Sequence, residues 1–207
     1  MKLLLFSDLH CDASAAQALV ERAREVDVVV GAGDFATARR GIGTTVEVLK
    51  SIACPAVLVP GNGESCEELA AACRGWSAAH VLHGSGATID GVQFYGLGGG
   101  VPVTPFGSWS YDFTEAEAAA LLADCPADCV LVSHSPPHGA LDRSSAGVAL
   151  GSRALRAVVE QTRPALVVCG HVHEWAGQSV QLGSTPVVNG GSRGLVWDLA
   201  TGAPNRG

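Results

Sequence analysis

Short apolar runs alternate with Ala-rich stretches of helical length, and this alternation constrains the fold more than any other feature of the chain. The runs cover residues 2–6, 27–30 and 56–59, and the helices expected after them cover about 14–24, 39–50 and 64–73. Strands that alternate with helices pair in parallel and are joined by right-handed crossovers. The first third of the chain is therefore expected to form a parallel sheet.

The rest of the chain has shorter runs and more turns. Expected strands cover residues 80–83, 88–90, 92–97, 129–132 and 165–169, and an antiparallel meander is expected at 178–182, 186–189 and 195–199. A Gly-rich loop at 98–107 precedes a helix with Thr114 as its N-cap and Glu117 as the capping-box partner, and a further helix is expected at about 152–161. We expect an α/β (α+β) fold of two packed sheets with helices outside, in one domain spanning residues 1–207.

The amino-acid composition and net charge of the chain argue against several classes of protein, such as disordered, membrane-spanning and duplex-binding proteins. Apolar residues make up 47% of the 207 residues and charged residues only 16%, which is typical of a globular protein. The net charge of −7 argues against a duplex nucleic-acid partner, although bound cations can still attract a small phosphate. The apolar runs are too short to span a bilayer, and the first is too short for a secretory leader. We therefore expect a soluble, cytoplasmic protein with reduced cysteines and no membrane partner.

The residues that end five of the apolar runs carry the chemical information. An Asp, Asn or His follows each run, and together these residues are Asp8, His10, Asp34, Asn62, His134, His171 and His173. The carboxyl ends of parallel strands form the edge where α/β sheets bind ligands. Carboxylate, amide and imidazole groups together suit a borderline-to-hard divalent cation.

Local spacing supports convergence of these side chains. Asp8 and His10, like His171 and His173, are two residues apart, which in extended backbone places both side chains on one side. A glycine precedes three of the seven residues and allows a tight turn with close approach of a ligand. Each motif alone is an ordinary turn or a hydrogen-bonded histidine, whereas all five motifs in order favour a metal centre.

The motifs resemble those of the calcineurin-like metallophosphoesterase superfamily over most of the chain. They are Asp8-x-His10, Gly33-Asp34, Gly61-Asn62, His134 and Gly170-His171-x-His173. The runs at residues 134–142, 170–174 and 188–190 look like those of its Icc-like and MPPED-like branch. The resemblance implies a four-layer fold, in which two packed mixed β-sheets form a sandwich flanked by helices, with two metal ions on one rim.

The resemblance also implies a role for each residue. Asp8, His10 and His173 would hold the first ion, Asn62, His134 and His171 the second, and Asp34 would bridge both, with Asp34, Asn62 and His134 also catalytic. Manganese is the expected metal, with iron, zinc, cobalt or nickel as alternatives. A bridging hydroxide would attack the phosphorus of a small cyclic-nucleotide or aryl phosphodiester. A phosphomonoesterase and a catalytically silent metal-binding interaction scaffold are the alternatives with the same fold.

One position departs from the family pattern. The family's third motif continues from Gly-Asn to a His that is thought to protonate the leaving oxygen, but Gly63 stands there in this chain and opens space for a substrate. General-acid help is typically worth about 100- to 10,000-fold. Either the substrate has a good or strained leaving group, or another group replaces the acid. His83 and His138 are the candidates for that replacement, and each is otherwise a surface or loop histidine.

Three further residues have weaker signals. Trp109, with Phe106, would form a lid or a stacking wall for a base or aryl group, or else part of a turn-rich connection between the sheets. Arg193 would contact a phosphate or lie on the surface. Glu64 is expected in the first turn of its helix, where its charge suits the helix dipole. The expected partners are a small phosphoester and, through pairing of two copies, a homodimer.

Overall fold

The computed structural model describes residues 1–204, so positions 205–207 of the expected domain lie outside the described residues. Within them, the strands form two six-stranded sheets. The first sheet has the order β12 (Ala203–Pro204), β11 (Leu195–Asp198), β1 (Lys2–Phe6), β2 (Val28–Ala32), β3 (Ala56–Val59), β4 (Ala79–Val81). The second has the order β5 (Ser85–Ile89), β6 (Val92–Leu97), β7 (Val130–Ser133), β8 (Leu166–Cys169), β10 (Thr185–Asn189), β9 (Ser179–Leu182).

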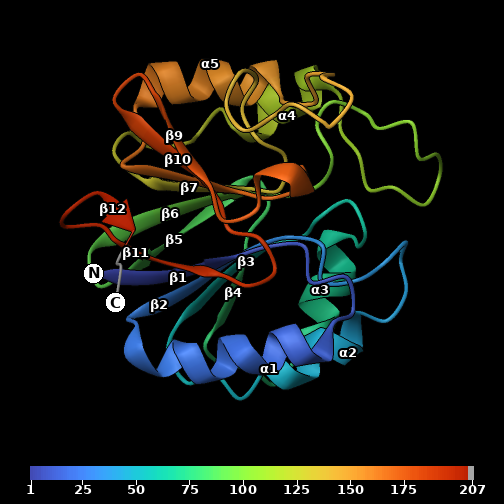
Figure 1. Ribbon diagram of the computed structural model, residues 1–207, viewed down its shortest axis with the longest axis vertical. Coiled ribbons are helices and arrows are strands. Elements are labelled where there is room, and N and C mark those ends of the chain that lie inside the picture. The colour runs from blue at the N-terminus through green and yellow to red at the C-terminus, as the bar shows by residue number, and fades with distance from the viewer. Residues whose placement is uncertain (205–207) are drawn as a thin grey trace.

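Helices cover the outer face of each sheet, so the molecule has four layers (Figure 1). The first sheet is covered by α1 (Ala13–Arg22), α2 (Ile42–Leu49) and α3 (Cys66–Ala72), and the second by α4 (Glu115–Leu121) and α5 (Arg153–Thr162). The described chain also contains two short 3-10 helices, which are η1 (Ala23–Glu25) and η2 (His173–Trp175). This arrangement of two mixed sheets flanked by helices confirms the predicted fold class. None of the helices in the described part of the chain has the length and apolarity needed to cross a membrane.

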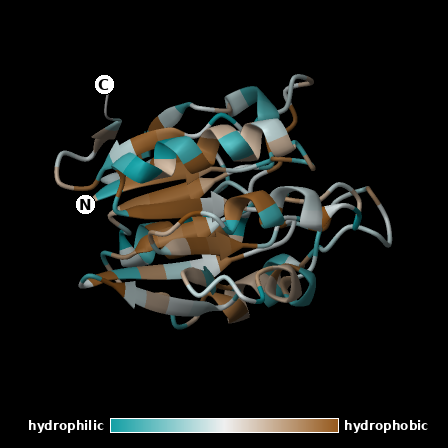
Figure 2. Ribbon diagram, turned by 90° about the horizontal axis from the view of Figure 1, so that it is seen from below, coloured by the Kyte–Doolittle hydropathy of each residue, from teal (hydrophilic) through white to brown (hydrophobic). Residues whose placement is uncertain are grey.

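Successive side chains of the central strands point to opposite faces of each sheet, and this divides the hydrophobic core into three layers. In β1, Leu4 and Phe6 pack against α1 and α2, while Leu3 and Leu5 face the second sheet. The strands β7 and β8 repeat this pattern toward α4 and α5. Strands that are buried on both faces are apolar at every position, which is why their sequences read as continuous runs. Figure 2 shows these hydrophobic strands inside and the mixed helices outside.

The predicted C-terminal meander is wrong in one respect. Strands β9 and β10 pair antiparallel as expected, but β10 also pairs in parallel with β8. The chain then leaves for the other sheet, where β11 runs antiparallel to β1. Gly190 makes this crossing possible, because a Cβ there would lie 2.6 Å from the Cα of Phe6. The glycine thus allows the chain to pass directly over the end of β1.

The second helix begins later than its sequence pattern indicates. The prediction started it at residue 39, whereas α2 begins at Ile42. Ala38, Arg39 and Gly41 have φ values of 47°, 66° and 76°, in the left-handed region that a right-handed helix excludes. The tight turn before the helix therefore replaces its expected first residues.

Capping boxes begin two of the helices. Thr114 and Glu117 form the predicted box at the start of α4. Ser65 and Glu68 form a second box at the start of α3. Glu64 precedes this cap, so the prediction that it belongs to the first helical turn is wrong. Its carboxylate has buried backbone partners instead.

Candidate metal centre

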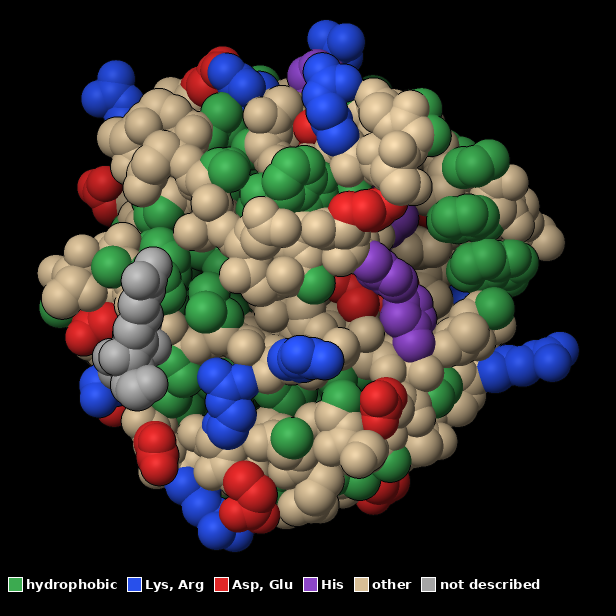
Figure 3. Space-filling model, in the orientation of Figure 1, with side chains coloured by type: hydrophobic (Ala, Val, Ile, Leu, Met, Phe, Trp, Pro, Cys, Tyr) green, Lys and Arg blue, Asp and Glu red, His purple; other side chains and the backbone are tan. Residues whose placement is uncertain are grey.

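The predicted ligands meet at the rim between the two sheets. Strands β1, β2 and β3 of the first sheet and β7 and β8 of the second all end there, because the neighbouring strands in each group are parallel. Figure 3 shows a row of histidine side chains on this face, with acidic side chains next to them. The edge rule for parallel strands is thus satisfied by two sheets at once.

The first group of ligand atoms is open to solvent. Asp8, His10 and His173 offer atoms that all lie within 4.8 Å of one another. The Nε2 atoms of His10 and His173 are 3.2 Å apart, and Asp8 Oδ1 lies 3.5 Å from His173 Nε2. The His173 side chain is 60% exposed, whereas that of Asp8 is 6% exposed. An ion held here would therefore be accessible to a substrate.

In the second group, Asn62 and His134 are buried and His171 is partly buried, and the backbone orients the His134 imidazole. His134 Nε2 lies 3.1 Å from Asn62 Oδ1, and the His134 ring packs edge-on against His171 with centroids 4.9 Å apart. The other nitrogen, Nδ1, donates to the Ala32 carbonyl over 2.8 Å. A histidine whose Nδ1 proton is held by a carbonyl presents its Nε2 lone pair to an ion.

Asp34 contacts both groups. Its Oδ1 lies 3.5 Å from His134 Nε2, and its Oδ2 lies 3.5 Å from His10 Nε2. The Gly63 N–H donates to Asp34 Oδ1 over 2.7 Å. Asp8 also offers a ligand atom within 4.8 Å of those of Asp34 and His134, so the Asp8 carboxylate lies close to both ligand groups.

These spacings fit divalent ions. Donor atoms on adjacent coordination positions, with bonds of about 2.1 Å, lie about 3.0–3.5 Å apart. The distances of 3.2 Å between His10 and His173 and of 3.5 Å around Asp34 match that range. Imidazole and carboxylate groups that face one another form a donor set suited to borderline metals.

The backbone that brings these side chains together differs from the prediction. Asp8, His10 and His171 have φ values of 57°, 45° and 66°, so the expectation of extended backbone is wrong. Asp34, at 57°, shares this left-handed conformation. Such residues cost on the order of 1–3 kcal/mol each and cluster at functional sites. Tight turns, and not stretches of extended backbone, therefore place these side chains at the rim.

The glycines of the motifs permit close approach of the acidic side chains at the rim. A Cβ on Gly170 would lie 2.6 Å from Asp8 Oδ2. A Cβ on Gly61 would overlap the carboxylate of Asp34. Any side chain at these two positions would displace a predicted ligand.

Electrostatics favour the ligating form of two residues. Burial alone would raise the pKa of Asp8, but the hydrogen bond with His173 and the nearby His134 lower it to about 2. Burial and the neighbouring His134 lower the pKa of His171 to about 3. An ionised carboxylate and a neutral imidazole are the forms that bind metal.

Glu64 joins the two ligand-bearing loops, and sequence reasoning missed this contact. Its Oε1 accepts from the Gly61 N–H over 2.7 Å and from the Phe35 N–H over 3.3 Å. Its Oε2 accepts from the Ala36 N–H over 2.8 Å. Burial and the charge of Asp34 raise the pKa of Glu64 to about 7. The signal available in the sequence was an acid placed directly before an N-cap serine.

Ser110 is a second residue that sequence reasoning missed. Its hydroxyl accepts a 3.0 Å hydrogen bond from Asn62 Nδ2, and the neighbouring Tyr111 N–H donates to the Asn62 carbonyl over 3.0 Å. Asn62 Oδ1 is thereby directed toward His134. Ser110 lies 48 residues from Asn62 in the sequence, and no local sequence pattern predicts this contact.

Two of the weaker candidates have structural partners. His83 accepts a hydrogen bond on Nδ1 from the Gly98 N–H over 3.1 Å, and its ring packs on Phe113 with centroids 4.8 Å apart. His138 Nδ1 lies 3.3 Å from a carboxylate oxygen of Asp142. The structure does not bring either residue into the ligand groups described above.

The other two weaker candidates lie on loops. Trp109 stacks on Phe106 in the loop before α4. Arg193 lines a hollow of about 450 Å³ together with Gly191 and Ala176, next to the 3-10 turn that begins with His173.

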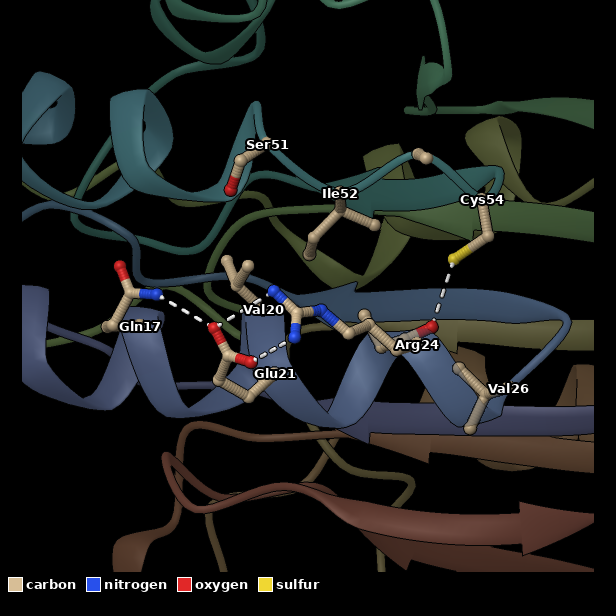
Figure 4. Close-up of a pocket in the computed structure, with 10 residues that line it drawn as sticks. Gln17, Val20, Glu21, Arg24, Val26, Ser51, Ile52 and Cys54 are labelled. Atoms are coloured by element: carbon tan, nitrogen blue, oxygen red, sulfur yellow. Dashed lines mark hydrogen bonds and ion pairs between the residues drawn. The ribbon is translucent and has the colours of Figure 1, made fainter.

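A second hollow lies at the opposite edge of the first sheet. It has a volume of about 610 Å³ and opens between the end of α1 and the segment that precedes β3 (Figure 4). An Arg24–Glu21 ion pair of 2.7 Å lies on the wall formed by the helix, and the Cys54 thiol donates to the Ala23 carbonyl over 3.7 Å. None of the predicted ligands lines this hollow.

Comparison with known proteins found matches in sequence and in fold. A UPF0046 protein of Caenorhabditis elegans is 36% identical over 113 residues, which cover 52% of this chain but only 36% of that longer protein. The crystal structure of TT1561 of Thermus thermophilus matches with a TM-score of 0.81 at 17% identity, over 99% of this chain and 96% of that one. A dimetal phosphatase of Danio rerio matches with a TM-score of 0.61 at 16% identity, over 91% and 86%.

The two structural matches have low sequence identity and show the fold alone. The family model for the calcineurin-like phosphoesterase superfamily domain matches residues 1–202, which is nearly the whole chain. That family implies a dinuclear divalent metal centre, and the groups at the rim supply candidate ligands for it. The chain belongs to the calcineurin-like phosphoesterase superfamily.

Proposed function

We propose that this protein is a metal-dependent phosphodiesterase that acts on small phosphodiesters. The observation that carries the proposal is the position of Asp34, whose two carboxylate oxygens face His134 and His10 in separate ligand groups. A carboxylate placed between two ligand groups can bridge the two ions of a dinuclear site. Membership of the superfamily makes phosphoester hydrolysis the general activity, and the diester preference is our further step.

The seven ligands would divide between two ions. Asp8, His10 and His173 would hold the exposed ion, Asn62, His134 and His171 the buried one, and Asp34 both. Bound divalent ions would polarise phosphoryl oxygens and lower the pKa of a water molecule at the site. Manganese is the metal we propose, because mixed nitrogen and oxygen donors accept it readily, while iron, zinc, cobalt and nickel use similar donors.

The residues of the chain supply orientation and charge. The Ala32 carbonyl fixes the tautomer of His134, and Ser110 fixes the direction of the Asn62 amide. The Gly63 N–H holds Asp34, but Gly63 offers no side chain that donates a proton. The leaving oxygen must therefore depart without help from this position. Aryl and strained cyclic diesters have leaving groups that meet this condition.

The sequence supports the preference for diesters over monoesters. The runs at residues 134–142 and 170–174 resemble those of the Icc-like and MPPED-like branch.

The test compares two chromogenic esters. Metal-stripped protein is assayed with bis-p-nitrophenyl phosphate and with p-nitrophenyl phosphate as manganese is restored. We expect manganese-dependent cleavage that favours the diester and disappears in Asn62→Ala and His134→Ala. A preference for the monoester would support the phosphomonoesterase alternative. Ion binding without turnover of either ester would support the silent scaffold.

A second pair of variants tests the replacement of the missing acid. If His83 or His138 protonates the leaving group, then His83→Ala or His138→Ala slows esters with poor leaving groups more than esters with good ones. We expect no such selective effect, because both histidines have structural partners. Selective loss in either variant would identify the replacement acid.

A further inference from the structure

A loop beside the metal centre exposes an unusual set of apolar side chains. The segment 98–113 connects β6 to α4, and Val103, Phe106 and Trp109 on it are 58%, 51% and 37% exposed. The rings of Phe106 and Trp109 stack with centroids 5.4 Å apart and planes at 14°. In Figure 3 exposed hydrophobic side chains gather on the same face of the molecule as the histidine row. Clustered apolar exposure of this kind marks a binding surface more often than scattered residues do.

Polar bonds, not these aromatic rings, hold the loop in shape. One Asp112 carboxylate oxygen accepts from the Thr104 N–H and hydroxyl over 3.0 and 2.7 Å. Its other oxygen accepts from the Ser110 hydroxyl over 2.8 Å. Backbone bonds from the Gly100 N–H to Tyr111 and from the Phe113 N–H to Gly100 close the base of the loop. The exposed rings are thus carried by a hydrogen-bonded frame whose bonds involve neither ring.

The same frame is fixed to a predicted ligand. Ser110, which immediately follows Trp109, accepts the hydrogen bond from the Asn62 side chain. Adjacent Cα atoms are about 3.8 Å apart, so the Trp109 backbone lies directly beside the residue that orients Asn62. The backbone that carries Trp109 therefore lies next to the residue that contacts the buried ligand Asn62.

The composition of the loop indicates what it binds. Residues 98–113 contain neither Lys nor Arg, so the loop offers no cation to a phosphate or to an anionic lipid surface. The phosphate group of a substrate would bind at the metal ions, and the uncharged organic group of the substrate would contact the loop. Two nearly parallel rings present a flat face, and a planar aromatic group stacks on such a face.

We infer that Phe106 and Trp109 form a stacking platform for a flat aromatic group, either an aryl ring or a nucleobase, carried by the phosphoester. This inference rests on the proposed function and adds the residues that select the organic part of the substrate. The platform acts on binding of that group and adds no chemical step.

The experiment keeps the leaving group constant and varies the other ester group. Phenyl p-nitrophenyl phosphate and methyl p-nitrophenyl phosphate are compared by kcat/KM with the manganese-loaded protein. Stacking on an aromatic side chain corresponds to a preference of about tenfold for the phenyl ester. We expect this ratio to fall to about twofold in Trp109→Ala and to be largely kept in Trp109→Phe, which retains a ring. Val180→Ala, at an exposed position on the edge strand β9, should keep the wild-type ratio.

A second readout does not depend on turnover. Binding of phenyl phosphate and methyl phosphate to the metal-loaded protein is measured by calorimetry in the same variants. A phenyl preference that Trp109→Ala abolishes supports the platform even if neither diester is cleaved, in which case only the proposed function fails. A wild-type ratio near one, or equal losses for both ligands in Trp109→Ala, would overturn the platform. A change of oligomeric state in Trp109→Ala with unchanged ratios would also overturn it, because the rings would then contact a second copy.

Discussion

Asn62 donates a 3.0 Å hydrogen bond from its side-chain Nδ2 to the hydroxyl of Ser110. The same amide turns its Oδ1 toward His134, at 3.1 Å. An amide has one oxygen and one nitrogen, so fixing the nitrogen fixes which atom faces an ion. Ser110 is therefore a positioning residue for the buried ligand group of the candidate metal centre.

Removing that hydroxyl should weaken the buried ion. Outer partners of metal ligands typically contribute about 10- to 100-fold in affinity or activity. We expect Ser110→Ala to raise the Kd of the tighter manganese ion by at least about tenfold, and Ser110→Thr, which keeps the hydroxyl, to stay near the wild type. Titration of metal-stripped protein by calorimetry measures this. Equal affinities in Ser110→Ala and the wild type would show that Asn62 needs no such partner.

Glu64 should contribute to stability through the loops that it joins. Its carboxylate accepts three buried backbone N–H groups, from Gly61, Phe35 and Ala36. Each buried donor left without a partner costs about 1–3 kcal/mol. We expect Glu64→Ala to lower the free energy of unfolding by about 3 kcal/mol or more in urea titrations. Glu67→Ala, at an exposed position in the first turn of the adjoining helix, is the matched control and should lower the free energy of unfolding far less than Glu64→Ala does, because an exposed acid there contributes only its weak interaction with the helix dipole.

The vacancy left by the missing motif histidine can be tested by restoring it. A Cβ at Gly63 would lie 3.0 Å from the Ala36 carbonyl oxygen and 3.1 Å from Asp34 Oδ1, so a side chain fits after small shifts. We expect Gly63→His to accelerate alkyl diesters, whose leaving groups are poor, by at least about tenfold relative to aryl diesters, since a general acid is worth about 100- to 10,000-fold. Gly63→Gln controls for bulk. The same change of ratio in both variants would rule out proton donation as its cause.

The pH dependence of stability should include His83. Burial lowers the pKa of His83 below its ordinary value of 6.5, more than the charge of Glu67 raises it. Only the neutral ring accepts the Gly98 N–H bond on Nδ1. The folded pKa is depressed, so the stabilisation is fully present above pH 6.5 and is lost as pH falls through the folded value.

Unfolding experiments across that pH window provide the check. We expect the slope of unfolding free energy against pH to become flatter in His83→Gln than in the wild type. His80→Gln, at an exposed position, should retain the wild-type slope. An unchanged slope in His83→Gln would mean that the ring titrates alike in the folded and unfolded states.

The sequence was sufficient to predict the strands and the meeting point of their ends. The predicted strands at 2–6, 56–59 and 92–97 match β1, β3 and β6. They are buried on both faces or bounded by glycine turns, so their apolar runs end where the strands end. The polar residue that follows β1, β2, β3, β7 and β8 then falls at the rim between the sheets.

Contacts between distant residues were beyond this reasoning. The hydrogen bond between Ser110 and Asn62 depends on how the long loop between β6 and α4 folds back toward Asn62, and neither residue type predicts this bond. The local rule for acids near a helix start placed Glu64 in the first helical turn, but the residue precedes the N-cap and its carboxylate accepts three backbone N–H groups instead. Strand β11 fits a hairpin pattern locally, yet tertiary pairing with β1 determines its sheet.

The bridging position of Asp34 is the central claim, and counting bound ions tests it most directly. Metal-stripped protein is loaded with manganese, freed of unbound ions, and its ions per chain are measured for the wild type, Asp34→Ala and the surface control Glu47→Gln. We predict two ions per chain in the wild type and in the control, with an exchange-coupled electron paramagnetic resonance signal from the pair. In Asp34→Ala we predict the loss of that coupling and of at least one ion. Two coupled ions in Asp34→Ala, or a single ion in the wild type, would contradict the account.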